Sequence, residues 1–142
     1  MTAGSWTLTN EFRTQLLEGT FSNLTTGSAV HVGLYTSSSN IGASSTTIAG
    51  VTNELSTADG YTAGGVTATL TATGTTSVTL SFSASVTWTA SGGSIVARFA
   101  VVYEPSGHVI AYCLLDNTPA DVTVTSGNTL TISNSNPVIT VA

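Results

Sequence analysis

The chain has 142 residues, which is enough for one domain with a hydrophobic core. Hydrophobic residues make up 41% of the chain and charged residues only 6%, with a net charge of −5 and only two basic side chains, Arg13 and Arg98. Binding to nucleic-acid phosphates or to an anionic membrane surface needs basic side chains. We therefore expect neither nucleic acid nor a membrane among the partners.

Hydroxyl side chains take the place of the missing charges, with 28 threonines and 19 serines. Threonine is β-branched and suits a half-exposed strand surface. No apolar run approaches the roughly 20 residues that a membrane-spanning helix needs. The N-terminus lacks the basic stretch and apolar core of a signal peptide, so we expect a soluble protein made in the cytosol.

Residues 7–19 are the only segment with a convincing helical pattern. Leu8, Phe12 and Leu16 recur at four-residue spacing, which predicts one apolar stripe. A helix of about three turns is not stable alone, so this stripe must pack on another element. The residues that can cap or end the helix are Thr9 or Asn10 at its start and Gly19 at its end.

After this helix the hydrophobic period changes to two, which is typical of β-strands. Residues 37–60 form a long polar connection with a helical turn expected around residues 47–54. Strands are predicted at residues 30–36, 65–73, 77–90, 95–104, 109–116, 121–125, 129–133 and 137–142.

The clearest alternation runs through residues 77–90, where even positions are apolar and odd positions are Ser or Thr. Fourteen residues at about 3.3 Å each exceed the usual strand length, so a bend or break is expected at residues 83–85. Short turns also predict two hairpins. The first joins residues 95–104 to 109–116, and the second joins residues 121–125 to 129–133.

Together these elements predict a mainly all-β protein with about eight strands and a short N-terminal helix. Residues 1–29 would form an N-terminal arm and the helix, and residues 30–142 a jelly-roll-like β-sandwich, in one domain overall. The sequence has no internal repeat of fixed period.

No residue pattern indicates catalysis or a bound cofactor. None of the seven acidic residues lies in a context that resembles a glycosidase pair, and we expect them to be solvated, with Asp59, Asp116 and Asp121 in or beside turns and loops. Neither the two histidines, His31 and His108, nor the lone Cys113 has the spacing of a metal site or a nucleophile elbow. We therefore expect no enzymatic activity, no cofactor and no metal, and a buried Cys113.

Two aromatic residues are candidates for interactions. Trp6 lies in the N-terminal arm and either anchors an interface with a neighbour or covers the core of its own domain. Tyr61 lies in the loop-like DGYTAGG and, with Tyr35 and Tyr112, is a candidate to contact a glycan. The alternative for Tyr61 is packing over the sheet edge.

Arg98 stands within the apolar segment IVARFAVVYE. Strict alternation places Ile95 to Tyr103 (odd positions) on one face and Arg98 on the other, away from the main core. We expect the N-terminal helix or a neighbouring subunit to cover this second face. An unpaired buried arginine is costly, so the guanidinium should bind backbone carbonyls or a carboxylate. The candidate carboxylates are Glu11, Glu18 and Glu54.

The segments EFRTQLLEGTF, VHVGLYTS, NELSTADGYTAGG, WTASGGSIVARFAVVY and TVTSGNTLTI occur in an order that resembles a family of small structural proteins of tailed bacteriophages. The resemblance spans residues 11–133, and NELSTADGYTAGG and WTASGGSIVARFAVVY are its most specific parts. Members of this family are head decoration (cement) or head fibre proteins.

The resemblance implies a non-enzymatic β-sandwich on the capsid exterior of a virion, made in the bacterial host cytoplasm. Its partners would be the major capsid protein and further copies of itself, as a homodimer or homotrimer. The structural or interface candidates are Trp6, Phe12, Leu16, Tyr61 and Arg98. Two alternatives stay open: a receptor- or carbohydrate-binding β-domain of a phage head or tail fibre, and a tail-tube or connector subunit.

Overall fold

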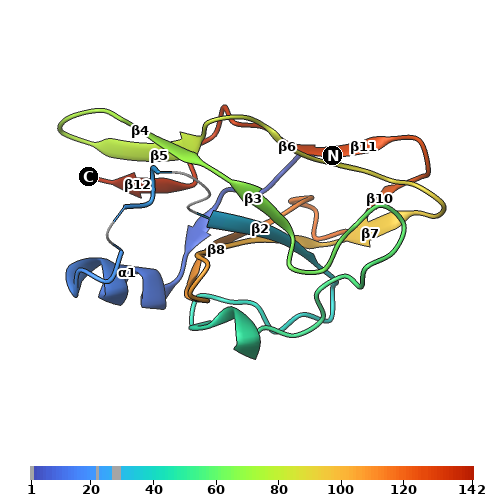
Figure 1. Cartoon of the computed structure of the whole chain (residues 1–142), viewed down its shortest axis with the longest axis horizontal. Coiled ribbons are helices and arrows are strands. Elements are labelled where there is room, and N and C mark those ends of the chain that lie inside the picture. Colours follow the sequence, from blue (N-terminus) through green and yellow to red (C-terminus); the bar gives the residue numbers. More distant parts are fainter. Residues whose placement is uncertain (1, 22, 27–29) are drawn as a thin grey trace.

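The computed structural model describes residues 2–21, 23–26 and 30–142. These residues form β-strands with one short α-helix and one turn of 3-10 helix, which confirms the predicted all-β class (Figure 1). The predicted boundary after residue 29 falls beside residues outside those described. The elements are β1 (Thr7–Leu8), α1 (Asn10–Leu17), β2 (Val30–Tyr35), η1 (Ile48–Gly50), β3 (Val66–Ala68), β4 (Leu70–Thr73), β5 (Val78–Phe82), β6 (Val86–Thr89), β7 (Ile95–Ala97), β8 (Phe99–Tyr103), β9 (Val109–Leu114), β10 (Val122–Val124), β11 (Thr129–Ile132) and β12 (Ile139–Val141).

The strands pair antiparallel and form two layers (Figure 1). One layer is the five-stranded sheet β1-β9-β8-β2-β3, extended by the pair β10-β7, and the other contains β12-β5-β4 and β11-β6. Apolar side chains of both layers meet in one core. They include Val32, Leu34, Ala100 and Val102 from the first layer, and Phe82, Val86, Trp88 and Leu130 from the second.

A second apolar cluster lies on the outer face of the five-stranded sheet. Its buried members are Tyr35, Val101, Tyr103 and Val109, and Ile41, Ile48 and Val51 from the long connection pack against them. Backbone hydrogen bonds hold this connection on the β8–β9 hairpin, with Ile48 N to Gly107 O at 2.7 Å and Val109 N to Thr46 O at 2.9 Å. The chain thus covers this outer face with its own loop, and not with the N-terminal helix that was expected to cover a second face of the sheet.

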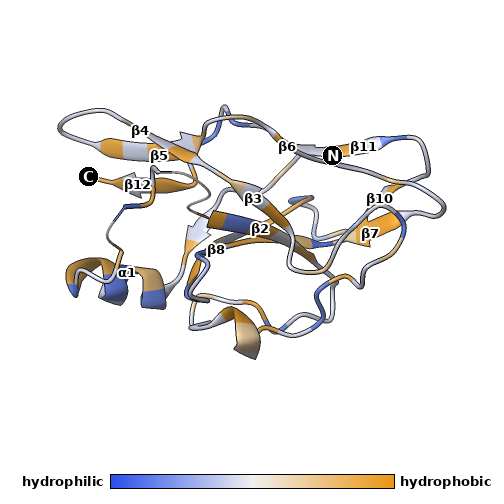
Figure 2. Ribbon diagram, in the orientation of Figure 1, coloured by the Kyte–Doolittle hydropathy of each residue, from blue (hydrophilic) through white to orange (hydrophobic). Residues whose placement is uncertain are grey.

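The N-terminal helix is shorter than predicted, because Thr7 and Leu8 pair with β9 as strand β1. Thr9 caps α1 by accepting a hydrogen bond from Phe12 N at 3.1 Å, and its hydroxyl donates to Val109 O at 2.6 Å. Within α1, Phe12 is buried, but Leu16 is 40% exposed. The predicted apolar stripe was wrong beyond Phe12, and Figure 2 shows α1 with hydrophobic and hydrophilic residues interspersed. No described helix is long and apolar enough to cross a bilayer.

Twelve strands occur in the described residues, against about eight predicted, because three predicted strands are each divided and β1 is added. Residues 65–73 divide at Thr69 and residues 95–104 at Arg98. The expected break at residues 83–85 is confirmed, with β5 ending at Phe82 and β6 beginning at Val86. Each break lets one segment of chain contribute to two different pairings.

One of the two predicted hairpins is confirmed, since β8 pairs with β9. The other was wrong. β10 pairs with β7, with Val122 opposite Ala97, and β11 pairs with β6, with Leu130 opposite Trp88. A short turn between two strands does not make a hairpin here, because each strand finds an apolar partner elsewhere.

The predicted alternation through Arg98 was also wrong. Ile95 and Ala97 face the main core, and so do Ala100 and Val102, whereas Val101 faces the second cluster. The side-chain order thus shifts by one residue at Arg98. Its N–H donates to Tyr35 O at 2.8 Å and its C=O accepts from Leu115 N at 2.9 Å. Before this residue the chain pairs with β10 as β7, and after it the chain pairs with β2 and β9 as β8.

Candidate functional site

A cluster of polar contacts joins the long connection to strand β2 through Tyr61 and Glu54. The Tyr61 hydroxyl donates to Glu54 Oε1 at 2.6 Å and accepts from Leu34 N at 3.1 Å. Gly64 N also donates to Glu54 Oε1, at 2.6 Å. We call these four residues, Leu34, Glu54, Tyr61 and Gly64, the Tyr61 latch.

The latch completes the edge of β2 where β3 no longer pairs with it. Leu55 N donates to Leu34 O at 2.9 Å, so the loop backbone satisfies the carbonyl of Leu34. The N–H of Leu34 donates to the Tyr61 hydroxyl. A side-chain oxygen therefore replaces a backbone carbonyl of a neighbouring strand, which keeps a buried peptide group paired.

Tyr103 and His31 extend this cluster along the sheet. The Tyr103 hydroxyl donates to Gly64 O at 2.6 Å, and His31 Nδ1 lies 3.2 Å from the same oxygen. The rings of His31 and Tyr103 stack with centroids 5.4 Å apart. Gly64 is thus held through both its N–H and its C=O, and the loop is fixed at this point.

Burial sets the protonation of the tyrosines. Burial above all, and then the hydrogen bond to Glu54, raises the pKa of Tyr61 far above its ordinary range. Burial also raises the pKa of Tyr35, with Glu54 and Tyr103 adding to the effect, and it raises the pKa of Tyr103 to about 12. These hydroxyls therefore stay protonated to higher pH than an exposed tyrosine, and those of Tyr61 and Tyr103 donate to Glu54 and to Gly64 O.

Two glycines allow the loop to approach the sheets this closely. Gly65 has φ +67°, and a Cβ there would overlap with the carbonyl oxygen of Val32. Gly60 has φ +91°, and a Cβ there would overlap with the carbonyl oxygen of Thr89. Positive φ and lack of a side chain are both required, which only glycine provides at low cost. The segments NELSTADGYTAGG and WTASGGSIVARFAVVY therefore build one interlocked unit.

Tyr61 was a predicted interaction residue, and the structure buries it, with 2% of its surface exposed. Tyr35 is buried as well, and Tyr112 is half-buried. The hydroxyl of Tyr61 is fully used inside the fold, so this residue cannot serve as a platform for a glycan. Packing against the sheet, the alternative, describes its position.

Arg98 forms an ion pair with Asp121, at 2.8 Å between Nε and Oδ1. The predicted partners were wrong, because Glu11 binds His108 Nδ1 at 2.8 Å and Glu54 belongs to the latch. The arginine side chain is 26% exposed and that of Asp121 39%. Arg98 lies at the break between β7 and β8, and Asp121 directly precedes β10, so the ion pair connects this break to the start of β10.

Replacing Arg98 with methionine should lower the free energy of unfolding by at most about 1 kcal/mol, because the ion pair is partly solvated. The backbone hydrogen bonds of residue 98 do not need the guanidinium. Urea denaturation at low and high salt measures the effect, and Asp121→Asn should give a similar loss. A loss above about 3 kcal/mol would show that the arginine is a buried charge after all.

The other predicted interface residues lie apart from the latch. Phe12 is 1% exposed and packs in the core, with its ring centroid 5.3 Å from that of Phe21. Trp6 is half-buried, packs against the same core and contacts Phe82, with centroids 6.0 Å apart and the rings at 70°. Of the two roles predicted for Trp6, these contacts within the chain agree with covering the core of its own domain.

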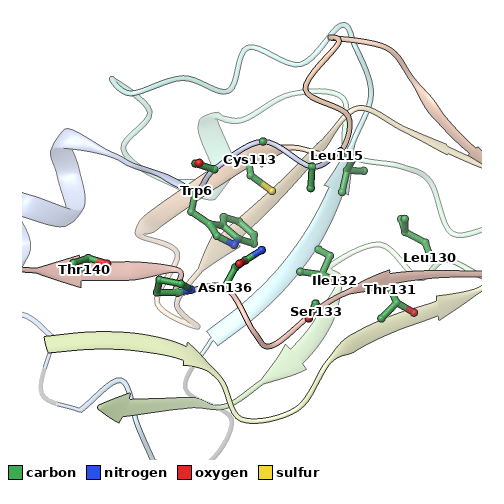
Figure 3. A pocket seen from close by; sticks show the side chains of 13 residues that line it. Trp6, Cys113, Leu115, Leu130, Thr131, Ile132, Ser133, Asn136 and Thr140 are labelled. Carbon is green, nitrogen blue, oxygen red and sulfur yellow. The ribbon is translucent and has the colours of Figure 1, made fainter. Parts of the chain in front are cut away.

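Trp6 also lines a cleft of about 490 Å³ between the N-terminal arm and the segment that joins β11 to β12 (Figure 3). Its walls are formed by residues 3–6, Cys113, Leu115, residues 130–133, Asn136, Pro137 and Thr140. Cys113 is buried, as predicted, and its thiol lies at this cleft. The cleft was not predicted, because it depends on β11 and β12 pairing with different strands, β6 and β5, which the sequence pattern does not reveal.

Alkaline conditions should destabilise the fold. Burial raises the pKa of Cys113 to about 12 from an ordinary value of 9.0, and that of Tyr103 to about 12 from 10.0. At a pH between the ordinary and the raised pKa of each group, the unfolded chain has lost the proton that the folded chain keeps. The free energy of unfolding therefore falls as pH rises from about 9 to 12.

Urea midpoints at pH 7, 9, 10 and 11 test this decline. Tyr103→Phe should show a shallower slope between pH 10 and 11 than the unaltered protein, whatever its stability at pH 7. Unchanged midpoints up to pH 11 would contradict the raised pKa values.

Sequence reasoning missed three roles of ionisable residues. Glu54 was named only as a partner for Arg98, Asp121 was expected to be solvated, and His108 with Glu11 fastens the β8–β9 hairpin to α1. The spacing NELSTADGY offers no signal of these contacts, since each joins positions distant in the chain or brought together by a loop. In the described part of the chain, no three His, Cys, Asp or Glu side chains are grouped to hold a metal ion.

Comparison of the chain with protein-family models, with curated proteins and with solved structures finds no match in any of the three.

Proposed function

We propose that this chain is a non-enzymatic decoration protein that binds the outside of a bacteriophage capsid and stabilises the head. Its partners in this role are the major capsid protein and further copies of itself, as a homodimer or homotrimer. The proposal rests on the resemblance of the sequence to small virion proteins and on the way the structure uses its few polar and ionisable groups.

The observation that carries the proposal is that the two most specific segments of the resemblance pack against each other and are held by hydrogen bonds within the chain. Tyr61 and Glu54 of the first segment close the edge of β2, and Arg98 of the second bridges to Asp121. The contacts of these residues run within the chain, as expected of a structural protein whose signature residues maintain shape.

The surface at α1 supports attachment to another protein. Leu17 is 90% exposed and Leu16 is 40% exposed, at the end of the molecule opposite β7 (Figure 1). Exposed leucines on a chain with so little charge favour burial against a partner. We assign the capsid-facing surface to α1.

The copy number of the protein in purified, tail-free heads tests the proposal. Decoration predicts many copies per head, at positions set by the icosahedral lattice. Heads that lack the protein should also release DNA at lower temperature than complete heads. Presence only in tails, or about a dozen copies per particle, would overturn the proposal.

Leu17→Ser should weaken binding of the purified protein to undecorated heads by about tenfold, because an exposed apolar contact is lost. The change should leave the folding stability within about 0.5 kcal/mol of the original value, since Leu17 makes little contact within the chain. Val96→Ser, at an exposed valine on β7, is the matched control and should bind normally. Equal binding of both variants would refute the assignment of the capsid surface to α1.

A further inference from the structure

The Trp6 cleft is separate from the latch and from α1, and its origin lies in the topology. β11 pairs with β6 and β12 pairs with β5, so the second layer opens where residues 133–138 connect them. The N-terminal arm faces this opening from the first layer. A volume of about 490 Å³ is within the range of small-molecule sites, about 300–1,000 Å³.

The lining of this cleft is electrically neutral. None of its thirteen residues is Asp, Glu, Lys, Arg or His. Cys113 stays a neutral thiol, consistent with its raised pKa. An ion in the cleft would lose hydration without gaining a counter-charge, so the lining selects against charged ligands.

Apolar and polar groups are arranged around the cleft in a definite way. Trp6, Leu115, Leu130 and Ile132 supply apolar surface, while Ser5, Asn136 and Thr140 supply hydroxyl and amide groups. Within the described residues, these three polar side chains make no hydrogen bond to protein. They are therefore free to bind a ligand that carries both donors and acceptors.

The indole of Trp6 lies between Cys113 and Asn136 in Figure 3, with the Asn136 side chain beside the ring. Its contact with Phe82 is edge-on, at 70° between the ring planes, so Phe82 does not stack on the indole. An aromatic surface beside a free amide suits a molecule with an apolar face and polar edges.

An extended peptide does not fit this site through strand pairing. The edge of β9 is already occupied by the arm, since Gly4 N donates to Leu114 O at 2.9 Å and β1 pairs with Tyr112 and Ala111. A purely apolar chain would leave Ser5, Asn136 and Thr140 without new partners. A sugar ring matches both parts of the lining, because its C–H groups form an apolar face and its hydroxyls lie around the ring edge.

We propose that the Trp6 cleft binds a neutral glycan, with one sugar ring against the indole and its hydroxyls on Ser5, Asn136 and Thr140. The proposal goes beyond capsid decoration and does not rest on it, because the site lies within a single chain. It also differs from the glycan contact predicted at Tyr61, which is buried.

The purified protein tests this proposal in two steps. An array of neutral, sialylated and sulfated glycans identifies the preferred sugar, and the free neutral oligosaccharides found, with maltose and lactose included, are then titrated by NMR. We expect saturable binding of a neutral glycan that shifts the indole N–H signal of Trp6 and leaves that of buried Trp88 in place.

Asn136→Ala should weaken this binding at least about tenfold, whereas Asn134→Ala should not change it. Asn134 lies in the same connection but outside the cleft, and its amide oxygen accepts from the Ser85 hydroxyl at 3.3 Å. Because both asparagines are exposed, both variants should fold. Three results would each overturn the proposal: no neutral glycan bound at millimolar concentration, preference for charged glycans, or binding insensitive to Asn136→Ala. Capsid binding measured in parallel separates this outcome from that of the decoration role.

Discussion

Gly65→Ala is expected to prevent stable folding, with a loss above about 4 kcal/mol in the free energy of unfolding. A Cβ at this position would overlap with the backbone carbonyl of Val32, and Val32 pairs with both β3 and β8. Relief therefore requires a shift of β2, which is hydrogen-bonded to a neighbouring strand on each side within the five-stranded sheet. Whole domains have only about 5–15 kcal/mol of stability, so one such shift is enough to unfold many of the molecules.

The neighbouring Gly64 is the matched control for this prediction. Its φ is +94°, also positive, but a Cβ there would meet nothing within 4 Å. Gly64→Ala should cost about 1–2 kcal/mol, the price of an unfavourable φ for an L-residue. Gly65, at φ +67°, lies nearer the left-handed region that other residues tolerate. If backbone conformation alone mattered, Gly64→Ala would be the more harmful change, and urea denaturation of both variants decides between these explanations.

The pattern of the sequence predicted what depends on local alternation. Residues 77–90 alternate cleanly, and both the buried face at Phe82, Val86 and Trp88 and the break near residues 83–85 follow from that pattern and from strand length. The N-terminal cap at Thr9 also follows from a local rule. These features depend on residues within one strand or one helical turn.

What the sequence could not predict depends on pairing between distant segments. Nothing local to Arg98 indicates that side chains change face there, because the break arises when β7 leaves to pair with β10. The same holds for Leu16. Its spacing from Phe12 predicts one buried stripe, but within α1 Phe12 is buried and Leu16 is exposed. The candidate site shares this dependence, since Tyr61 meets Leu34 across 27 positions of the chain.

Tyr61→Phe is expected to lower the free energy of unfolding by about 2–3 kcal/mol. The change removes one oxygen atom and leaves the aromatic packing in place. Leu34, which is 0% exposed, then keeps a buried N–H without an acceptor, a loss that typically costs about 1–3 kcal/mol. Glu54 also loses a short hydrogen bond, and bonds to charged groups contribute about 1.5–3 kcal/mol.

A double-mutant cycle separates these two contributions. Glu54→Ala removes the acceptor of both the Tyr61 hydroxyl and Gly64 N, and its combination with Tyr61→Phe should cost less than the sum of the single changes by about 1–2 kcal/mol. Tyr112→Phe is the control, because among the described residues the Tyr112 hydroxyl has no hydrogen-bond partner, and its loss should stay within about 0.5 kcal/mol. Additive single changes would mean that Tyr61 and Glu54 act independently. A Tyr61→Phe loss no larger than that of Tyr112→Phe would show that water can replace the hydroxyl at Leu34, and the latch would then be no more than a surface contact.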